Sequence, residues 1–116
     1  MNRIALKKVA VRLNGGAVRG SSVRLARVMG VSLPTVRAWL SDPDDEAKYR
    51  RMTRGARRLL ATMVLLDGAG LLDDRFIAAV DTFDQLLNEG EARLDQALQA
   101  LHASSSEDGM IDEEEE

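Results

Sequence analysis

The sequence contains no cysteine, only two prolines and few aromatic residues. Without cysteine the chain has no disulfide and no thiolate ligand for a metal. Aromatic residues make up 3% of the chain and hydrophobic residues 45%, so aliphatic side chains must form most of the core. No apolar run approaches the roughly 20 residues that a membrane-spanning helix needs. The N-terminal stretch 1–13 is basic and lacks a signal-peptide pattern, so we expect a cytoplasmic protein without a cofactor, metal or membrane partner.

Charge is distributed very unevenly along the chain. Residues 1–60 contain 14 Lys and Arg against four Asp and Glu, a net charge of +10. Residues 61–116 contain two basic and 15 acidic residues, a net charge of -13. This asymmetry, hidden in the overall charge of -3, predicts that the N-terminal half binds a polyanion and that the C-terminal half has another role.

Hydrophobic residues recur at helical spacing, and no stretch alternates as a strand would. Glycines and the caps Ser21 and Ser32 divide the pattern into five expected helices. Their expected ranges are 3–13, 21–29, 32–40, 53–67 and 72–102. We therefore predict an all-α fold with a DNA-binding domain over 1–70, a long C-terminal dimerisation helix over 71–103 and a disordered acidic tail over 104–116.

Residues 22–41 have the pattern of two short helices joined by a sharp turn. Ala26, Gly30 and Val36 are the fifth, ninth and fifteenth of these twenty residues, where close helix packing, a turn and a buried aliphatic side chain are required. The segment GVSLPTVRAWL resembles the turn and recognition helix of phage repressor, Cro and XRE-type regulators, and the resemblance extends over about residues 3–66. It departs from that family in the glycine-rich loop 15–20 and in Pro34.

The resemblance implies that the second helix of this helix-turn-helix enters the major groove of double-stranded DNA. The residues then expected to face the bases are Ser32, Leu33, Thr35, Arg37, Ala38 and Ser41. Arg37 is the strongest candidate, because a guanidinium pairs bidentately with guanine O6 and N7. We expect Trp39 in the core rather than stacked on a base. The alternative to a DNA-binding helix-turn-helix is that these two helices are only a small α-hairpin within the core.

Basic residues around this motif are candidate phosphate ligands, with a solvated charged face as the alternative. The predicted phosphate contacts are Ser22, Lys7, Lys8, Arg50, Arg51, Arg54, Arg57 and Arg58.

An apolar stripe follows residues 76–101 in steps of four and three, which is typical of a coiled-coil seam. The predicted dimer interface consists of Phe76, Val80, Phe83, Leu87, Leu94 and Leu101. Gly90 and Ala97 weaken this seam. The alternative is that this stripe packs on the preceding helix of the same chain. We favour a combination, in which the first half of the stripe packs on the domain and the second half pairs with another copy.

The sequence has no arrangement of residues typical of catalysis, and we do not expect an enzyme. These patterns predict a homodimeric, nucleoid-associated transcriptional regulator, most simply a repressor of a bacterial or phage operon, that binds a pseudo-palindromic operator and needs no small-molecule ligand. The alternative is a protein-interaction module, such as an antitoxin or an acidic inhibitor that mimics DNA. The acidic tail either aids solubility or competes with DNA for the basic half.

Overall fold

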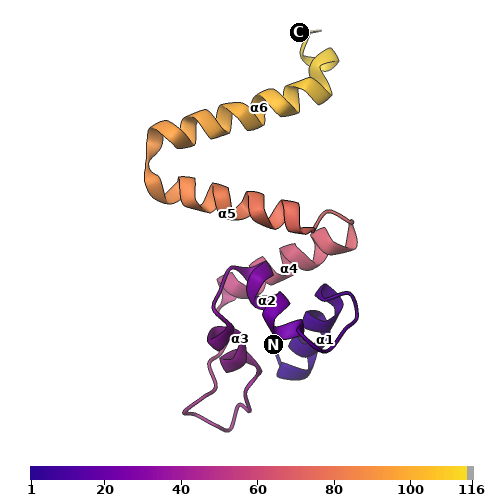
Figure 1. Ribbon diagram of the computed structural model, residues 1–116, viewed down its shortest axis with the longest axis vertical. Helices are drawn as coiled ribbons and strands as arrows, with labels where there is room; N and C mark the ends of the chain where they lie inside the picture. The colour runs from indigo at the N-terminus through magenta and orange to yellow at the C-terminus, as the bar shows by residue number, and fades with distance from the viewer. Residues whose placement is uncertain (115–116) are drawn as a thin grey trace. The chain divides into compact units, whose positions relative to one another are not determined.

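In the computed structural model, residues 1–114 are described, and all of their regular elements are helices. The helices are α1 (Arg3–Leu13), α2 (Ser21–Met29), α3 (Leu33–Leu40), α4 (Arg54–Gly68), α5 (Asp74–Glu89) and α6 (Glu91–Glu114) (Figure 1). The prediction of an all-α fold is confirmed. The chain divides into two compact units, unit 1 (Met1–Ile77) and unit 2 (Ala78–Glu116). None of the helices described here has the length and apolar character needed to cross a membrane.

Helix α2 is at the centre of unit 1 and packs against α1, α3 and α4. Leu25 of α2 and Val36 of α3 are fully buried, and Trp39 is only 8% exposed. Trp39 therefore lies in the core, as expected. Apolar residues recur every three or four positions, so they share one face of each helix, and these faces together form the core. Its buried hydrophobic members in the first four helices are Leu6, Ala10, Leu13, Leu25, Ala26, Val28, Met29, Val36, Trp39, Leu60 and Met63.

The starts of α1, α3, α4 and α5 are fixed by polar side chains that accept a backbone hydrogen bond. Asn2 accepts from the Ala5 N–H at 2.8 Å, and Thr53 accepts from the Ala56 N–H at 3.1 Å. Helix α2 is different, because its N-cap is Gly20 with φ +83° and no side-chain cap. The prediction that Ser21 caps this helix was wrong: Ser21 is its first residue and is fully buried.

The first turn of α5 belongs to unit 1. Leu72 and Ile77 are buried in the same core, and Phe76 packs against it. The carboxylate of Asp73 accepts the Phe76 N–H at 2.8 Å, and Arg24 of α2 donates to Asp74 at 2.9 Å. The first bond caps α5, and the second attaches its start to α2.

The long C-terminal helix predicted over 71–103 is wrong as a single element. Gly90 adopts φ +133°, a conformation that other residues rarely reach, and the helix is interrupted there. Arg93 pairs with Glu89 at 2.6 Å across the interruption. Helix α6 continues to Glu114, so the disorder predicted for residues 104–116 is not confirmed, and residues 115–116 lie outside the described part.

Candidate nucleic-acid interface

The turn between α2 and α3 is built by Gly30. This residue has φ +69°, and its N–H returns to the carbonyl oxygen of Ala26. The next N–H, that of Val31, donates to the same carbonyl at 3.1 Å. A left-handed residue at this position ends α2 and satisfies a carbonyl that would otherwise be left without a partner. The chain can therefore start α3 after only three residues, 30–32.

The start of α3 is organised by two hydroxyl groups. The Ser32 Oγ accepts the Thr35 N–H at 3.2 Å, which confirms the predicted cap. The hydroxyls of Ser32 and Thr35 also lie 2.8 Å apart and share a hydrogen bond. Pro34 lies in the first turn, where its missing N–H leaves no intrahelical bond unmade. This end of α3 therefore presents a fixed pair of small polar groups at the surface.

The six residues predicted to face DNA all reach the surface of unit 1. Ser32 and Arg37 are exposed, whereas Leu33, Thr35, Ala38 and Ser41 are half-buried. Between them, Val36 and Trp39 point into the core. The Ser41 hydroxyl donates to the Arg37 carbonyl at 2.8 Å, so it closes the last turn of the helix. Arg37 is the only charged member of the set.

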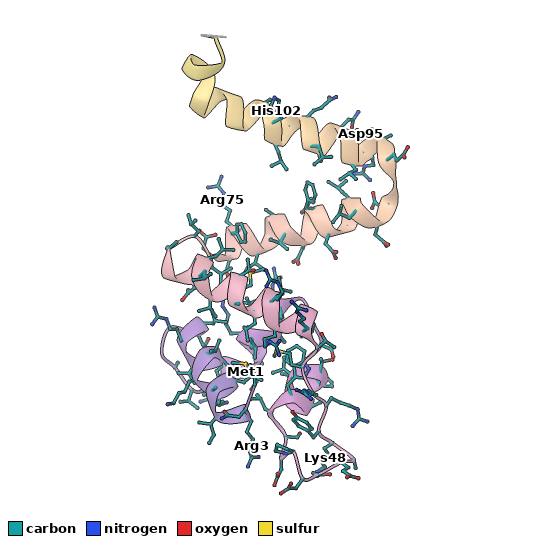
Figure 2. All side chains as sticks on the ribbon, turned by 180° about the vertical axis from the view of Figure 1, so that it is seen from behind. Met1, Arg3, Lys48, Arg75, Asp95 and His102 are labelled. Atoms are coloured by element: carbon teal, nitrogen blue, oxygen red, sulfur yellow. The ribbon has the colours of Figure 1, made fainter. Side chains whose placement is uncertain are left out.

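Arg50 has a role that the sequence analysis missed. Its Nη1 donates to the carbonyl oxygens of Tyr49 at 2.8 Å and Glu46 at 3.3 Å, and its backbone N–H donates to Ala38 of α3 at 3.2 Å. These bonds hold the loop that follows α3 against the end of that helix. The Nη1 of Arg50 is thus engaged by its own loop, while the side chain is exposed and its other N–H groups remain available for the predicted phosphate contact. No sequence signal marks this role, because it depends on the path of the loop. Lys48, at the far end of the same loop, points into solvent (Figure 2).

Helix α4 begins with a cluster of cations. Arg54, Arg57 and Arg58 are exposed in its first two turns, and Arg51 is exposed just before it. The N-terminal end of a helix carries partial positive charge and unpaired N–H groups, so these cations raise the local potential further. An anion such as a DNA phosphate would relieve that repulsion.

On α1 and α2, the predicted phosphate ligands differ in their surroundings. Lys8 is exposed, and Ser22 is half-buried in the first turn of α2. Lys7 is half-buried, and its Nζ donates to the buried Ser21 hydroxyl at 3.1 Å. An ammonium has three donors, so Lys7 keeps two for another partner. The bond also attaches α1 to the start of α2.

The predicted dimer residues do not form one continuous surface. Phe76 packs on the core of unit 1, so it is not part of a dimer interface and agrees with packing of the first part of the stripe on the domain. Val80, Leu87 and Leu101 are exposed, and Phe83 and Leu94 are half-buried. The interruption at Gly90 separates the first four of these residues from the last two.

Within the described residues, no group of three or more acidic or histidine side chains is arranged to hold a metal ion. Comparison with known protein families, curated proteins and solved structures found no match for this chain.

Proposed function

We propose that this protein is a sequence-specific double-stranded-DNA-binding regulator that reads the major groove with α3. The observation that carries the proposal is the arrangement of α2, the Gly30 turn and α3. A short helix with a buried inner face presents Arg37 and the hydroxyls of Ser32 and Thr35 on its outer face. A helix of this kind fits the major groove, where arginine and hydroxyl side chains discriminate base edges.

The distribution of charge supports the same proposal. Unit 1 contains 15 basic and seven acidic residues, so its formal net charge is +8 although the whole chain is at -3. Exposed cations at the start of α4 and on α1 would provide the phosphate contacts that orient a recognition helix. The bond of Lys7 to Ser21 attaches α1 to α2, and the bonds of Arg50 hold the loop that follows the reading helix against its end.

The simplest regulator of this kind is a dimer that binds a pseudo-palindromic site. Half-sites would lie about 10 bp apart or a multiple of that, since the two heads must reach the same face of the duplex. The C-terminal helices would provide the contact between copies. Repression of a bacterial or phage operon, by blocking transcription, is the form of regulation that needs no further domain.

A second candidate is a protein-interaction module, and one observation favours it. Leu87, Leu98 and Leu101 of unit 2 are between 47% and 60% exposed, which is unusual for leucines along two adjacent helices. An antitoxin or an acidic inhibitor would use such a surface to hold a protein partner. In that case DNA would not be the main ligand.

Selection of binding sites from random duplex DNA with the purified full-length chain tests the first proposal. We expect a pseudo-palindrome to be enriched, and the affinity for it to fall steeply with salt because phosphate contacts release counterions. Recovery of no preferred sequence at low and moderate salt would contradict sequence-specific binding. Stable capture of one protein partner by DNA-free protein would then favour the second candidate.

A further inference from the structure

An apolar hollow lies between α1 and α4 on the surface of unit 1. Its volume is about 470 Å³, and one of the residues that line it, Arg57, has a charged side chain. The residues that line it are Met1, Val9, Arg57, Leu60, Ala61, Val64 and Leu65. Leu65 is 74% exposed and Met1 is 47% exposed, so both leave apolar surface in contact with water. Covering this surface would release free energy in proportion to its area.

A complementary surface occurs on α6 of unit 2. Leu94, Leu98 and Leu101 lie three and four residues apart, so they share one face of the helix. None of the side chains described between residues 78 and 103 is buried, which means that unit 2 has no core of its own there. Glu91 and Asp95 precede Leu98 by seven and three residues and lie along the same face. Asp95 extends from α6 into solvent (Figure 2).

A second copy has two surfaces that α6 could contact, its own unit 2 and the hollow of its unit 1, and net charge favours the hollow. Unit 2 contains one basic and 12 acidic residues, a formal net charge of -11, whereas unit 1 is at +8. Pairing of unit 2 with unit 2 would bring like charges together. Contact of unit 2 with the arginine-edged hollow would bring unlike charges together, which favours association and its rate.

The spacing of charged and apolar residues also fits. In α4, Arg57 precedes Leu65 by eight residues, a rise of about 12 Å. In α6, Glu91 precedes Leu98 by seven residues, a rise of about 10.5 Å. If the two helices run parallel, the carboxylates of α6 meet the guanidinium of Arg57 while the leucines of α6 enter the hollow. Arg57 then pairs within the dimer, and Arg51, Arg54 and Arg58 remain for phosphate contacts.

We propose that the hollow between α1 and α4 binds the leucine face of α6 from a second copy of this chain, so that two reciprocal contacts hold the dimer. This inference deepens the proposed function, because it specifies the contact that brings two reading heads together. Only the role of the dimer in DNA binding rests on the proposed function. The contact itself is tested without DNA.

The absence of cysteine allows a direct test by site-specific crosslinking. Leu65→Cys and Leu98→Cys are made separately in the full-length chain and distinguished by a mass tag. Both side chains are exposed, at 74% and 47%, so the substitutions leave the core intact. The variants are mixed and treated with a short thiol-to-thiol crosslinker. We expect the mixed 65–98 product to dominate over the 65–65 and 98–98 products.

Other crosslinking patterns overturn the proposal. A dominant 98–98 product would mean that unit 2 pairs with itself. A crosslink found only within one chain of the double variant, with a monomeric protein, would mean that the contact is intramolecular. A monomeric protein that gives no crosslink would remove the contact altogether.

Substitutions with glutamate provide an independent measurement by sedimentation. Leu65→Glu and Leu98→Glu should each raise the dimer dissociation constant about tenfold or more, since each places a charge where both proposed contacts would bury a leucine. Val18→Glu, at a 65% exposed loop valine, and Leu87→Glu, at a 60% exposed leucine of α5, are the matched controls and should have little effect. Loss of the dimer in Leu87→Glu but not in Leu65→Glu would instead support the coiled-coil seam.

The salt dependence of association distinguishes this contact from self-pairing of unit 2, and DNA selection distinguishes it from the proposed function. Association through unlike charges should weaken as salt rises, whereas pairing of two acidic units should strengthen. A 65–98 crosslink in a protein that selects no DNA sequence would leave the contact standing and contradict the proposed function. Sequence-specific binding without that crosslink would do the reverse.

Discussion

Replacement of Arg37 by alanine separates base recognition from every other contribution to DNA binding. Arg37 is exposed on α3, so its loss should change the free energy of unfolding by no more than about 0.5 kcal/mol. A bidentate contact of a guanidinium with guanine contributes about 1–3 kcal/mol of discrimination, which corresponds to about a 5- to 150-fold change in Kd. Affinity for the selected operator should fall by this factor while the protein remains folded.

Fluorescence anisotropy on a set of duplexes measures the effect. The set contains the selected operator and the three duplexes that differ from it at one guanine position. Wild-type protein should discriminate among the four, and the Arg37→Ala variant should bind them almost equally. Thermal unfolding followed by circular dichroism, on the same samples, verifies that the variant is folded.

Lys8→Ala is the matched control, because Lys8 is an exposed cation on α1 that is predicted to contact a phosphate. It should weaken binding to all four duplexes equally and reduce the slope of log K against log salt by about one. The reasoning about Arg37 is refuted if Arg37→Ala behaves in the same way, with equal weakening on every duplex. Arg37 would then be a phosphate ligand and not a base reader.

Three further perturbations test the fold and the tail. Leu25→Ala removes a fully buried side chain and should lower the free energy of unfolding by about 2–5 kcal/mol in urea titration; a loss below about 1 kcal/mol would contradict its central place in the core. Gly30→Ala should destabilise by about 1–2 kcal/mol because φ is +69°, whereas Gly68→Ala, at a helical glycine with open space, should stabilise by about 0.5–1 kcal/mol; the same sign for both would contradict the turn geometry. Deletion of residues 104–116 should tighten DNA binding at low salt if the acidic tail competes with DNA, and an unchanged Kd would eliminate that competition.

The positions of the first four helices follow from local sequence. Helical spacing of aliphatic residues, glycines at the ends and the hydroxyl caps at Ser32 and Thr53 all act within a few residues of each other. The same local pattern places Val36 and Trp39 inward and Arg37 outward, because a helix of known start has a fixed angular order of side chains. For that reason the surface of α3 was predictable before its packing was known.

Other features depend on contacts between residues that are distant in the sequence. Arg24 and Asp74 are 50 residues apart and meet at 2.9 Å, and Phe76 joins the core of unit 1 rather than a seam with later residues. Whether an apolar stripe faces its own domain or a partner is not encoded in its period, since both arrangements bury the same face. Only packing distinguishes them.

The sequence by itself determined an all-helical chain with a basic half and an acidic half, and a short helix with Arg37 on its outer face. These properties are local or additive, so they need no knowledge of the tertiary arrangement. The tertiary structure decided that the expected C-terminal helix is interrupted at Gly90, that Arg50 bonds its own loop, and that α1 and α4 leave an apolar hollow between them. Each of these depends on backbone conformation or on the meeting of distant segments, which short-range patterns do not specify.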